Sequence, residues 1–235
     1  MKKIIPVIIV AIFFANCNYR SIKGSGVIAT ETRTITSAER IKSLGSFDVE
    51  ITPGETTSLK IVGDDNIVKH IVAEKRDGIL VIKMEGNMNY STENKLTIYI
   101  TTPKIEEVSL AGSGNIITKG KFTGSEKLKV SVAGSGDANL QVNTPEIKVS
   151  IAGSGNIELA GETKNVTVKI AGSGNFRGEN LKAENVETHI AGSGDAKVFA
   201  DVKLNVHIAG SGSVFYKGNA TVTQKIAGSG EVKKM

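Results

Sequence analysis

Two histidines and two lysines in the second half of the chain are the side chains best suited to bind a ligand. They belong to a set of residues that stand two positions before an Ala-Gly-Ser-Gly sequence: Ser109, Ser131, Ser150, Lys169, His189, His207 and Lys225. If these positions stack, His189 and His207 lie about 5 Å apart, close enough to share a metal ion. The flanking lysines repel a cation, and no third ligand accompanies the pair. We therefore interpret the set as a basic strip that attracts acidic glycans or lipid head groups, in a contact that salt weakens.

A second set of polar residues directly follows the same four-residue sequence. Its members are Asn115, Asp137, Asn156, Asn175, Asp195, Ser213 and Glu231. Asn and Asp suit a turn because they tolerate left-handed conformations and hydrogen-bond to nearby backbone, which predicts a structural ladder. The alternative is a surface strip that binds a divalent cation or a sugar through Asn156, Asn175 and Asp195. Acid-base catalysis is unfavourable because Asp137 and Asp195 are expected roughly 14 Å apart, beyond the ~9.5 Å limit for a carboxylate pair.

The serine inside each Ala-Gly-Ser-Gly sequence could in principle be a nucleophile. It recurs seven times in equivalent positions, and no histidine or aspartate is matched to any single copy, as a nucleophile requires. The surrounding glycines also resemble a phosphate-binding loop, but such a loop opens onto a helix and carries a lysine beside the Ser or Thr. We interpret these serines as turn residues, and the sequence predicts no catalytic residue, no metal ligand and no cofactor.

The elements that position these side chains are set by the repeat itself. Ala-Gly-Ser-Gly begins at Ala111, Ala133, Ala152, Ala171, Ala191, Ala209 and Ala227, at spacings of 18 to 22 residues. A unit this short buries too few apolar side chains to offset the entropy of ordering its chain, so neighbouring repeats must share a core.

Between the repeated turns, apolar residues alternate with polar ones. Ile147, Val149 and Ile151 show this period of two, which predicts half-buried strands. Each repeat is too short to hold a crossover helix between parallel strands. We therefore predict an all-β fold, a right-handed parallel β-helix or β-solenoid with coils of about 19 residues. An antiparallel meander or sandwich stays open as the alternative, although identical turns stack naturally only in parallel coils.

The chain before the repeats reads differently. Residues 24–108 lack the repeated turn but contain four strand-like stretches, so we expect irregular first coils there and regular coils over 109–235, within one domain spanning 18–235. Gly-Ser-Gly-Val at 24–27 resembles a stray copy of the turn. Two inward columns are expected in the regular part: Leu110, Val132, Ile151, Ile170, Ile190, Ile208 and Ile226, and then Ile116, Ala138, Ile157, Phe176, Ala196 and Val214.

Residues 1–17 form a targeting segment. Two lysines precede an apolar stretch over 4–14 that is too short to span a bilayer, and Cys17 is the only cysteine. This arrangement resembles a bacterial lipobox, in which the cysteine becomes the lipidated first residue, although Phe14 and Asn16 depart from the usual pattern. We predict an exported protein held by lipid at the outer membrane or cell surface, with a periplasmic or secreted form as the alternative.

The same residues carry a family resemblance. Residues 24–27, 41–54, 64–67 and 77–82, followed by repeated Ala-Gly-Ser-Gly-Asn/Asp, resemble the family of putative auto-transporter adhesins with a head GIN domain. The resemblance extends over roughly residues 24–235. It implies an exported or surface-anchored β-helical domain, and it transfers no catalytic residues.

The overall charge points away from one class of partner. The net charge is +5 with basic and acidic residues interspersed, and aromatic residues make up 5% of the chain, so nucleic-acid binding is not expected. We favour a non-enzymatic envelope lipoprotein that acts as an adhesin or binds a surface polysaccharide or host ligand. The alternatives are a polysaccharide lyase or hydrolase, which β-helices often host, and a purely structural envelope protein. Two copies could also associate through the last coil.

Overall fold

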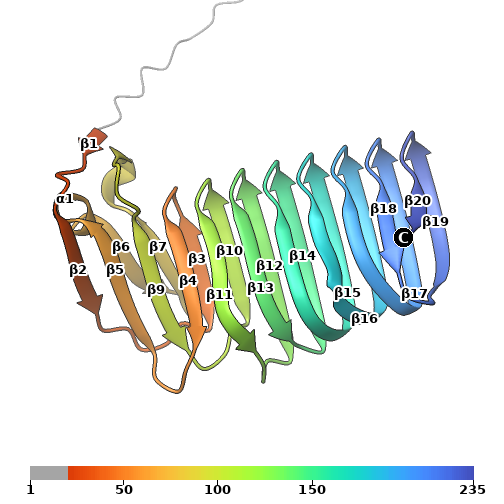
Figure 1. The fold of residues 1–235 in the computed structure, drawn as a ribbon, viewed down its shortest axis with the longest axis horizontal. Helices are drawn as coiled ribbons and strands as arrows, with labels where there is room; N and C mark the ends of the chain where they lie inside the picture. Colours follow the sequence, from red (N-terminus) through yellow and green to blue (C-terminus); the bar gives the residue numbers. More distant parts are fainter. Residues whose placement is uncertain (1–20) are drawn as a thin grey trace, which may run out of the picture.

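The protein is an elongated β-solenoid. The structure, a computed structural model, describes residues 21–235. It consists of about seven turns stacked along one axis, with an irregular region at the N-terminal end and the C-terminus at the other end (Figure 1). The predicted signal segment 1–17, with Cys17, lies outside the described residues. Among those described, no helix has the length and apolar character needed to cross a membrane.

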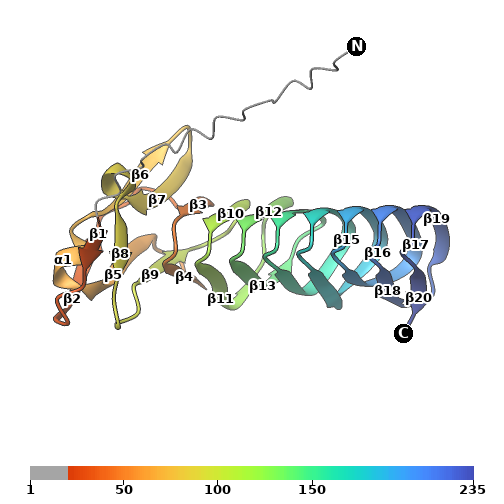
Figure 2. The same cartoon turned by 90° about the horizontal axis from the view of Figure 1, so that it is seen from above.

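Each regular coil has two faces, which Figure 2 shows as two layers of strands. Face A contains the strands that lead into the repeated turn: β10 (Glu107–Gly112), β12 (Lys127–Gly134), β14 (Glu146–Gly153), the second halves of β15 (Ile157–Gly172), β16 (Phe176–Gly192) and β17 (Ala196–Gly210), and then β19 (Thr221–Gly228). Face B contains β11 (Asn115–Phe122), β13 (Asp137–Asn143), the first halves of β15, β16 and β17, and then β18 (Val214–Lys217) and β20 (Val232–Lys234).

All neighbouring strands of the regular coils pair in parallel, shifted by one repeat. Ile151 lies opposite Ile170, and Ala152 lies opposite Ala171. The predicted solenoid is therefore confirmed, and the antiparallel meander is wrong for this part of the chain. The alternating apolar residues fix this register, because a shift by one residue would move every apolar side chain to the outside. The identical turns stack in the same register.

The core is a narrow aliphatic column between the two faces. Both predicted inward columns are buried along their length, with Ile151 2% exposed and Ile157 fully buried. Ile226, in the last coil, is only partly buried because no further coil covers it.

The glycines of the repeated turn are required by the close stacking of the backbone. Gly153 has φ +115°, a conformation that other residues rarely adopt. A Cβ atom on Gly155 would lie 2.1 Å from the carbonyl oxygen of Gly136 in the preceding coil. The first glycine therefore sets the direction of the turn, and the second allows consecutive turns to touch.

The N-terminal region continues the stack and then closes it. Strands β3 (Arg40–Leu44) and β4 (Asp48–Pro53) form a coil against β10 and β11, and β7 (Ile79–Met84) and β9 (Thr97–Thr102) form the next coil outward, all in parallel. Beyond them the pairing becomes antiparallel, with β6 (Ile71–Arg76) on β7, β5 (Ser58–Asp64) on β9 and β2 (Ile28–Arg33) on β5. The expected irregular first coils are thus present, together with an antiparallel cap.

Small elements complete this cap. They are β1 (Ser21–Lys23), which pairs with β8 (Asn89–Ser91), the helix α1 (Asp65–Val68) and the 3-10 turn η1 (Glu85–Asn87). In α1, Ile67 and Val68 are buried and fill the end of the core. The Arg33 guanidinium donates hydrogen bonds to the carbonyl oxygens of Val68 and Ile71, which ties β2 to the segment around α1.

Our interpretation of residues 24–27 as a copy of the repeated turn is wrong. The turn that stacks below Ala111-Gly112 follows Leu44, because Ala111 lies opposite Leu44. Residues 24–26 instead pack on Asp64, whose carboxylate accepts a hydrogen bond from the Gly26 N–H at 2.8 Å. In the turn after Leu44, Phe47 takes the place of the second glycine and is buried in the core, which hides the repeat from the sequence pattern.

Candidate functional site

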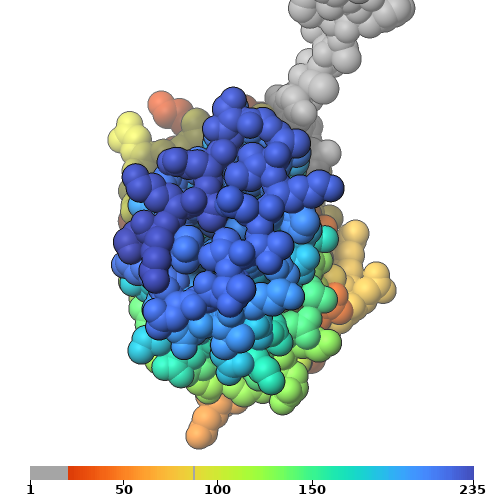
Figure 3. Space-filling view, turned by 90° about the vertical axis from the view of Figure 1, so that its right-hand side faces the viewer, coloured from red at the N-terminus to blue at the C-terminus, as the bar shows by residue number. Residues whose placement is uncertain are grey.

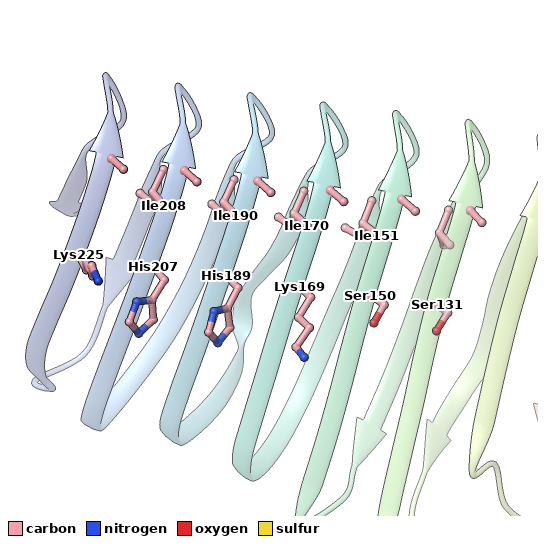
Figure 4. Close-up of a pocket in the computed structure, with 17 residues that line it drawn as sticks. Ser131, Ser150, Ile151, Lys169, Ile170, His189, Ile190, His207, Ile208 and Lys225 are labelled. Carbon is pink, nitrogen blue, oxygen red and sulfur yellow. The ribbon is translucent and has the colours of Figure 1, made fainter.

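One column of outward side chains runs along face A, one residue from each coil (Figure 4). Ser131, Ser150, Lys169, His189, His207 and Lys225 occupy matching positions on successive strands. We call this set the outer column. The rings of His189 and His207 are stacked, with centroids 5.0 Å apart and planes 8° from parallel, so the spacing expected for adjacent coils is confirmed.

A groove of about 710 Å³ follows the outer column. Its apolar lining comes from the alanines that begin the repeated turns and from the aliphatic residues just before them, while the outer column supplies its polar groups. We call the alanines the alanine row: Ala133, Ala152, Ala171, Ala191, Ala209 and Ala227. Because the alanine side chains point outward and are short, they leave a trench beside the longer lysine and histidine side chains.

The charge of the groove changes along its length. Its N-terminal half is bordered by Ser131 and Ser150, and its C-terminal half by the basic members of the outer column. Within residues 21–235, neither Lys169 nor Lys225 forms an ion pair with a carboxylate. Glu187 contacts this half, with its Oε1 2.9 Å from His189 Nε2. The C-terminal half therefore presents positive charge that the protein does not neutralise.

The neighbouring outward positions of face A are different, because there lysines and acids pair. Lys148 and Lys127 each lie 3.2 Å from a carboxylate oxygen of Glu146. Hydrogen bonds from Lys148 and Lys127 hold the pKa of Glu146 below its usual value. These lysines are engaged within the protein, whereas Lys169 and Lys225 are available to a ligand.

The second polar set forms a hydrogen-bonded ladder that is unbroken from Asp137 to Ser213. Asn156 donates from its side-chain amide to Asp137 Oδ1 at 2.8 Å, and Asn175 donates likewise to Asn156 Oδ1 at 2.9 Å. The backbone N–H of Asp195 donates to Asn175 Oδ1 at 3.0 Å, and that of Ser213 donates to Asp195 Oδ1 at 2.7 Å. The interpretation as a structural ladder is confirmed, and Oδ1 of each rung from Asp137 to Asp195 accepts a hydrogen bond from the next rung.

The first rung of this ladder was missed in the sequence. Asp48 accepts hydrogen bonds from the backbone and the side chain of Asn115, at 3.1 and 2.9 Å. The sequence does carry a signal, since Asp48 follows Gly45-Ser46, but Phe47 interrupts the motif. No cluster of three or more residues able to hold a metal ion occurs in the part of the chain that the structure describes.

Residues 39–220 match the family described as putative auto-transporter adhesin, head GIN domain. The chain belongs to this family. A solved structure described as a putative adhesin from Bacteroides fragilis is 26% identical, with a TM-score of 0.86 over 91% of this chain and all of the other. Among curated proteins, none matches the chain.

Two Parabacteroides distasonis structures are also similar to this head GIN domain. One is described as a putative lipid binding protein and is 26% identical, with a TM-score of 0.76 over 92% of this chain and all of the other. The second is described as a putative adhesin, and at 24% identity and a TM-score of 0.71, covering 92% of this chain and all of that one, it supports the fold alone. The fold expected from the family resemblance is thereby confirmed.

Proposed function

We propose that this chain is an exported, non-enzymatic adhesion module that holds a ligand of the cell surface along the face-A groove. The observation that most supports this proposal is the groove, an apolar trench bordered by Lys169 and Lys225. Neither lysine pairs with an acid of the described chain. Membership of the adhesin family supports a surface location. The rigid parallel coils suit such a role, because they hold one binding side chain from each repeat in a fixed line.

The proposal includes a lipid anchor at Cys17, after removal of residues 1–16. The sequence of the first 17 residues supports it, and the anchor would hold the protein at the outer membrane or cell surface. Metabolic labelling with an alkyne-bearing palmitate tests this step. We expect label on the wild type and none on Cys17→Ser, whereas equal labelling of both would overturn the anchor.

The lining of the groove argues for binding over catalysis. A glycosidase uses two carboxylates about 5 to 9.5 Å apart, and none of the residues that line the groove is an acid. Glu187, beside the groove, is engaged with His189. We therefore favour the adhesion module over a lyase or hydrolase, and also over a purely structural role that would leave the groove without a task.

Two ligand classes suit the groove. The basic side chains suit an acidic surface polysaccharide, as we expected from the sequence. The apolar lining favours a lipid, the class named for the Parabacteroides distasonis relative, which is similar to this chain over almost its whole length. In both cases the ligand extends along the solenoid axis, parallel to the outer column.

A binding and cleavage assay tests the proposed function. Residues 18–235, which include every described strand, are incubated with bacterial and host polysaccharides and with anionic lipid vesicles, and both retention and new chain ends are measured. We expect retention by at least one of these surfaces without cleavage, and weaker retention for Lys169→Glu with Lys225→Glu. The matched control Lys197→Glu with Lys217→Glu, which reverses two exposed lysines of face B, should bind normally. Release of chain ends, or equal binding by all variants, would contradict the proposal.

The last coil is the surface through which we propose that two copies can associate. Figure 3 looks onto this end, where the residues of the last coil, in dark blue, lie on the outside. In the described chain β19 pairs only with β17 and β20 only with β18, so their outer edges have no strand partner. Lys225, Lys233 and Lys234 place positive charge there, which limits association. Sedimentation equilibrium of wild type and Lys233→Glu with Lys234→Glu tests this point: a stronger dimer of the variant is expected, and monomers in both would overturn it.

A further inference from the structure

The groove has few polar groups, which suits a ligand that is mostly apolar. The lining contains two serines, two lysines and two histidines, and its other members are alanine, valine and isoleucine. A sugar laid along the alanine row would have hydroxyl groups with few partners, and each polar group that loses water without replacement weakens binding. The lining also offers no Trp, Tyr or Phe on which a sugar ring could stack. An alkyl chain has no hydrogen bonds to lose on such a surface, and the removal of its apolar surface from water favours binding.

The groove also has a direction. Its serine end and its basic end lie at opposite ends of the groove along the solenoid axis. From Ala133 to Ala209 the alanine row crosses four coil spacings, roughly 19 Å. At the basic end, Glu187 lies 2.9 Å from His189. Lys169 stands one coil from His189 and Lys225 stands two, so Lys225, with His207 beside it, is the lysine less opposed by this acid. A molecule with one negative end and one apolar end therefore matches the groove in a single orientation.

We propose that the groove binds a single-chain anionic amphiphile of the long-chain fatty acid type. Its acid group lies at His207 and Lys225, and its alkyl chain runs along the alanine row past Ala171 and Ala152 toward Ala133. Lys169 then flanks the alkyl chain with its methylene stem while its amine stays in water. This inference rests on the proposed function, because it places the ligand in the same groove.

The orientation gives an ordered set of variants. Lys225→Glu removes the positive charge beside the acid group and adds a repulsive one, so affinity should fall by about tenfold or more. Lys169→Glu should have a smaller effect, because only the side-chain stem contacts the ligand. Ala152→Glu places a charge under the alkyl chain and should abolish binding. Lys197→Glu makes the same charge change on face B and should leave affinity within about twofold.

The experiment is calorimetric titration of residues 18–235 with palmitate below its micelle concentration. Hexadecanol, which lacks the acid, and dextran sulfate, which lacks the alkyl chain, are the comparison probes. Thermal unfolding of every variant checks that it is folded, and all four substituted side chains are exposed or partly exposed, so folding should be retained. We expect one palmitate per chain, weaker binding of hexadecanol, and affinities that fall in the order wild type, Lys169→Glu, Lys225→Glu, Ala152→Glu.

Three results would overturn the inference. Equal loss of affinity in Lys169→Glu and Lys225→Glu would contradict the orientation, and equal binding of hexadecanol would contradict the acid contact. Retention of a polysaccharide without any binding of palmitate would reject the amphiphile while leaving the adhesion module in place. Failure of palmitate, polysaccharide and vesicles alike would reject both proposals.

Discussion

The two ends of the solenoid differ in how they close the core. At the N-terminal end, Ile67 is fully buried and Val68 is 2% exposed, under the antiparallel strands of the cap. At the C-terminal end, Val222 and Ile226 are only partly buried, and in the described residues no strand lies beyond β19. The core is therefore covered at the N-terminal end and partly exposed to water at the C-terminal end.

This difference shows what a repeat can and cannot do. A repeated coil buries its apolar side chains only against another coil, so a stack made of identical coils always leaves two open ends. The cap closes one end with non-repeated sequence: strands that reverse direction, a short helix, and Arg33, which donates hydrogen bonds to the carbonyl oxygens of Val68 and Ile71.

The largest effect is expected in the middle of the inward column. Ile151→Asp buries an unpaired charge between two coils, which should lower the free energy of unfolding by about 4 kcal/mol or more. Ile226→Asp makes the same change in the same column, but at the open end, where water can reach the carboxylate. It should cost about 1 kcal/mol. Urea denaturation followed by circular dichroism measures both, and equal losses would show that the last coil is covered in solution.

The next effect concerns the glycines. Gly155→Ala places a methyl group 2.1 Å from the Gly136 carbonyl oxygen in the closely stacked turns, and should cost about 3 kcal/mol. Gly26, in the cap, has φ +82° but open space around its Cβ position. Gly26→Ala should therefore cost only the backbone strain, about 1 to 2 kcal/mol. The same denaturation experiment compares them, and a costlier Gly26→Ala would refute the distinction between stacking and strain.

Acid should loosen the cap before the regular coils. Hydrogen bonds from Thr92, Asn94 and Gly26 hold the pKa of Asp64 below its ordinary 3.8. The stabilisation is complete above the unfolded pKa and is lost as pH falls through the lower folded value. We expect faster hydrogen exchange over residues 21–30 below about pH 3.8, and Asp64→Asn should show that exchange already at pH 7. If hydrogen exchange over residues 21–30 is unchanged both in the wild type at low pH and in Asp64→Asn at pH 7, Asp64 does not hold this segment in place.

The smallest effect belongs to the ladder. Asn175→Ala removes one donor and one acceptor from the row of rungs and should lower stability by about 1 kcal/mol. Asn139→Ala is the matched control, since Asn139 is an exposed residue of β13 outside the ladder, and it should be nearly neutral. A neutral Asn175→Ala would mean that water replaces the rung without cost.

Sequence pattern and tertiary structure agree wherever the repeat is regular. Period-two alternation identified Ile151 as inward and Lys169 as outward, and the constant spacing placed His189 beside His207. In a stack of equal coils, a residue's neighbours are the residues one period away, so local pattern and tertiary contact carry the same information. Where the period failed, so did the prediction: residues 24–27 resembled a turn of the stack, and the true first turn, after Leu44, was missed.

The repeat in the amino-acid sequence favours the parallel solenoid and predicts its inward columns and its line of basic side chains, because the repeat fixes register and register fixes which side chains share a face. Tertiary structure decided the rest. The chain inserts β3 and β4 between β7–β9 and β10–β11, out of sequence order. These pairings join strands far apart in the chain, outside the repeat, so no local pattern specifies them. The groove likewise exists only once the coils stack, when a row of short alanines comes to lie beside a row of longer side chains and the space between them opens.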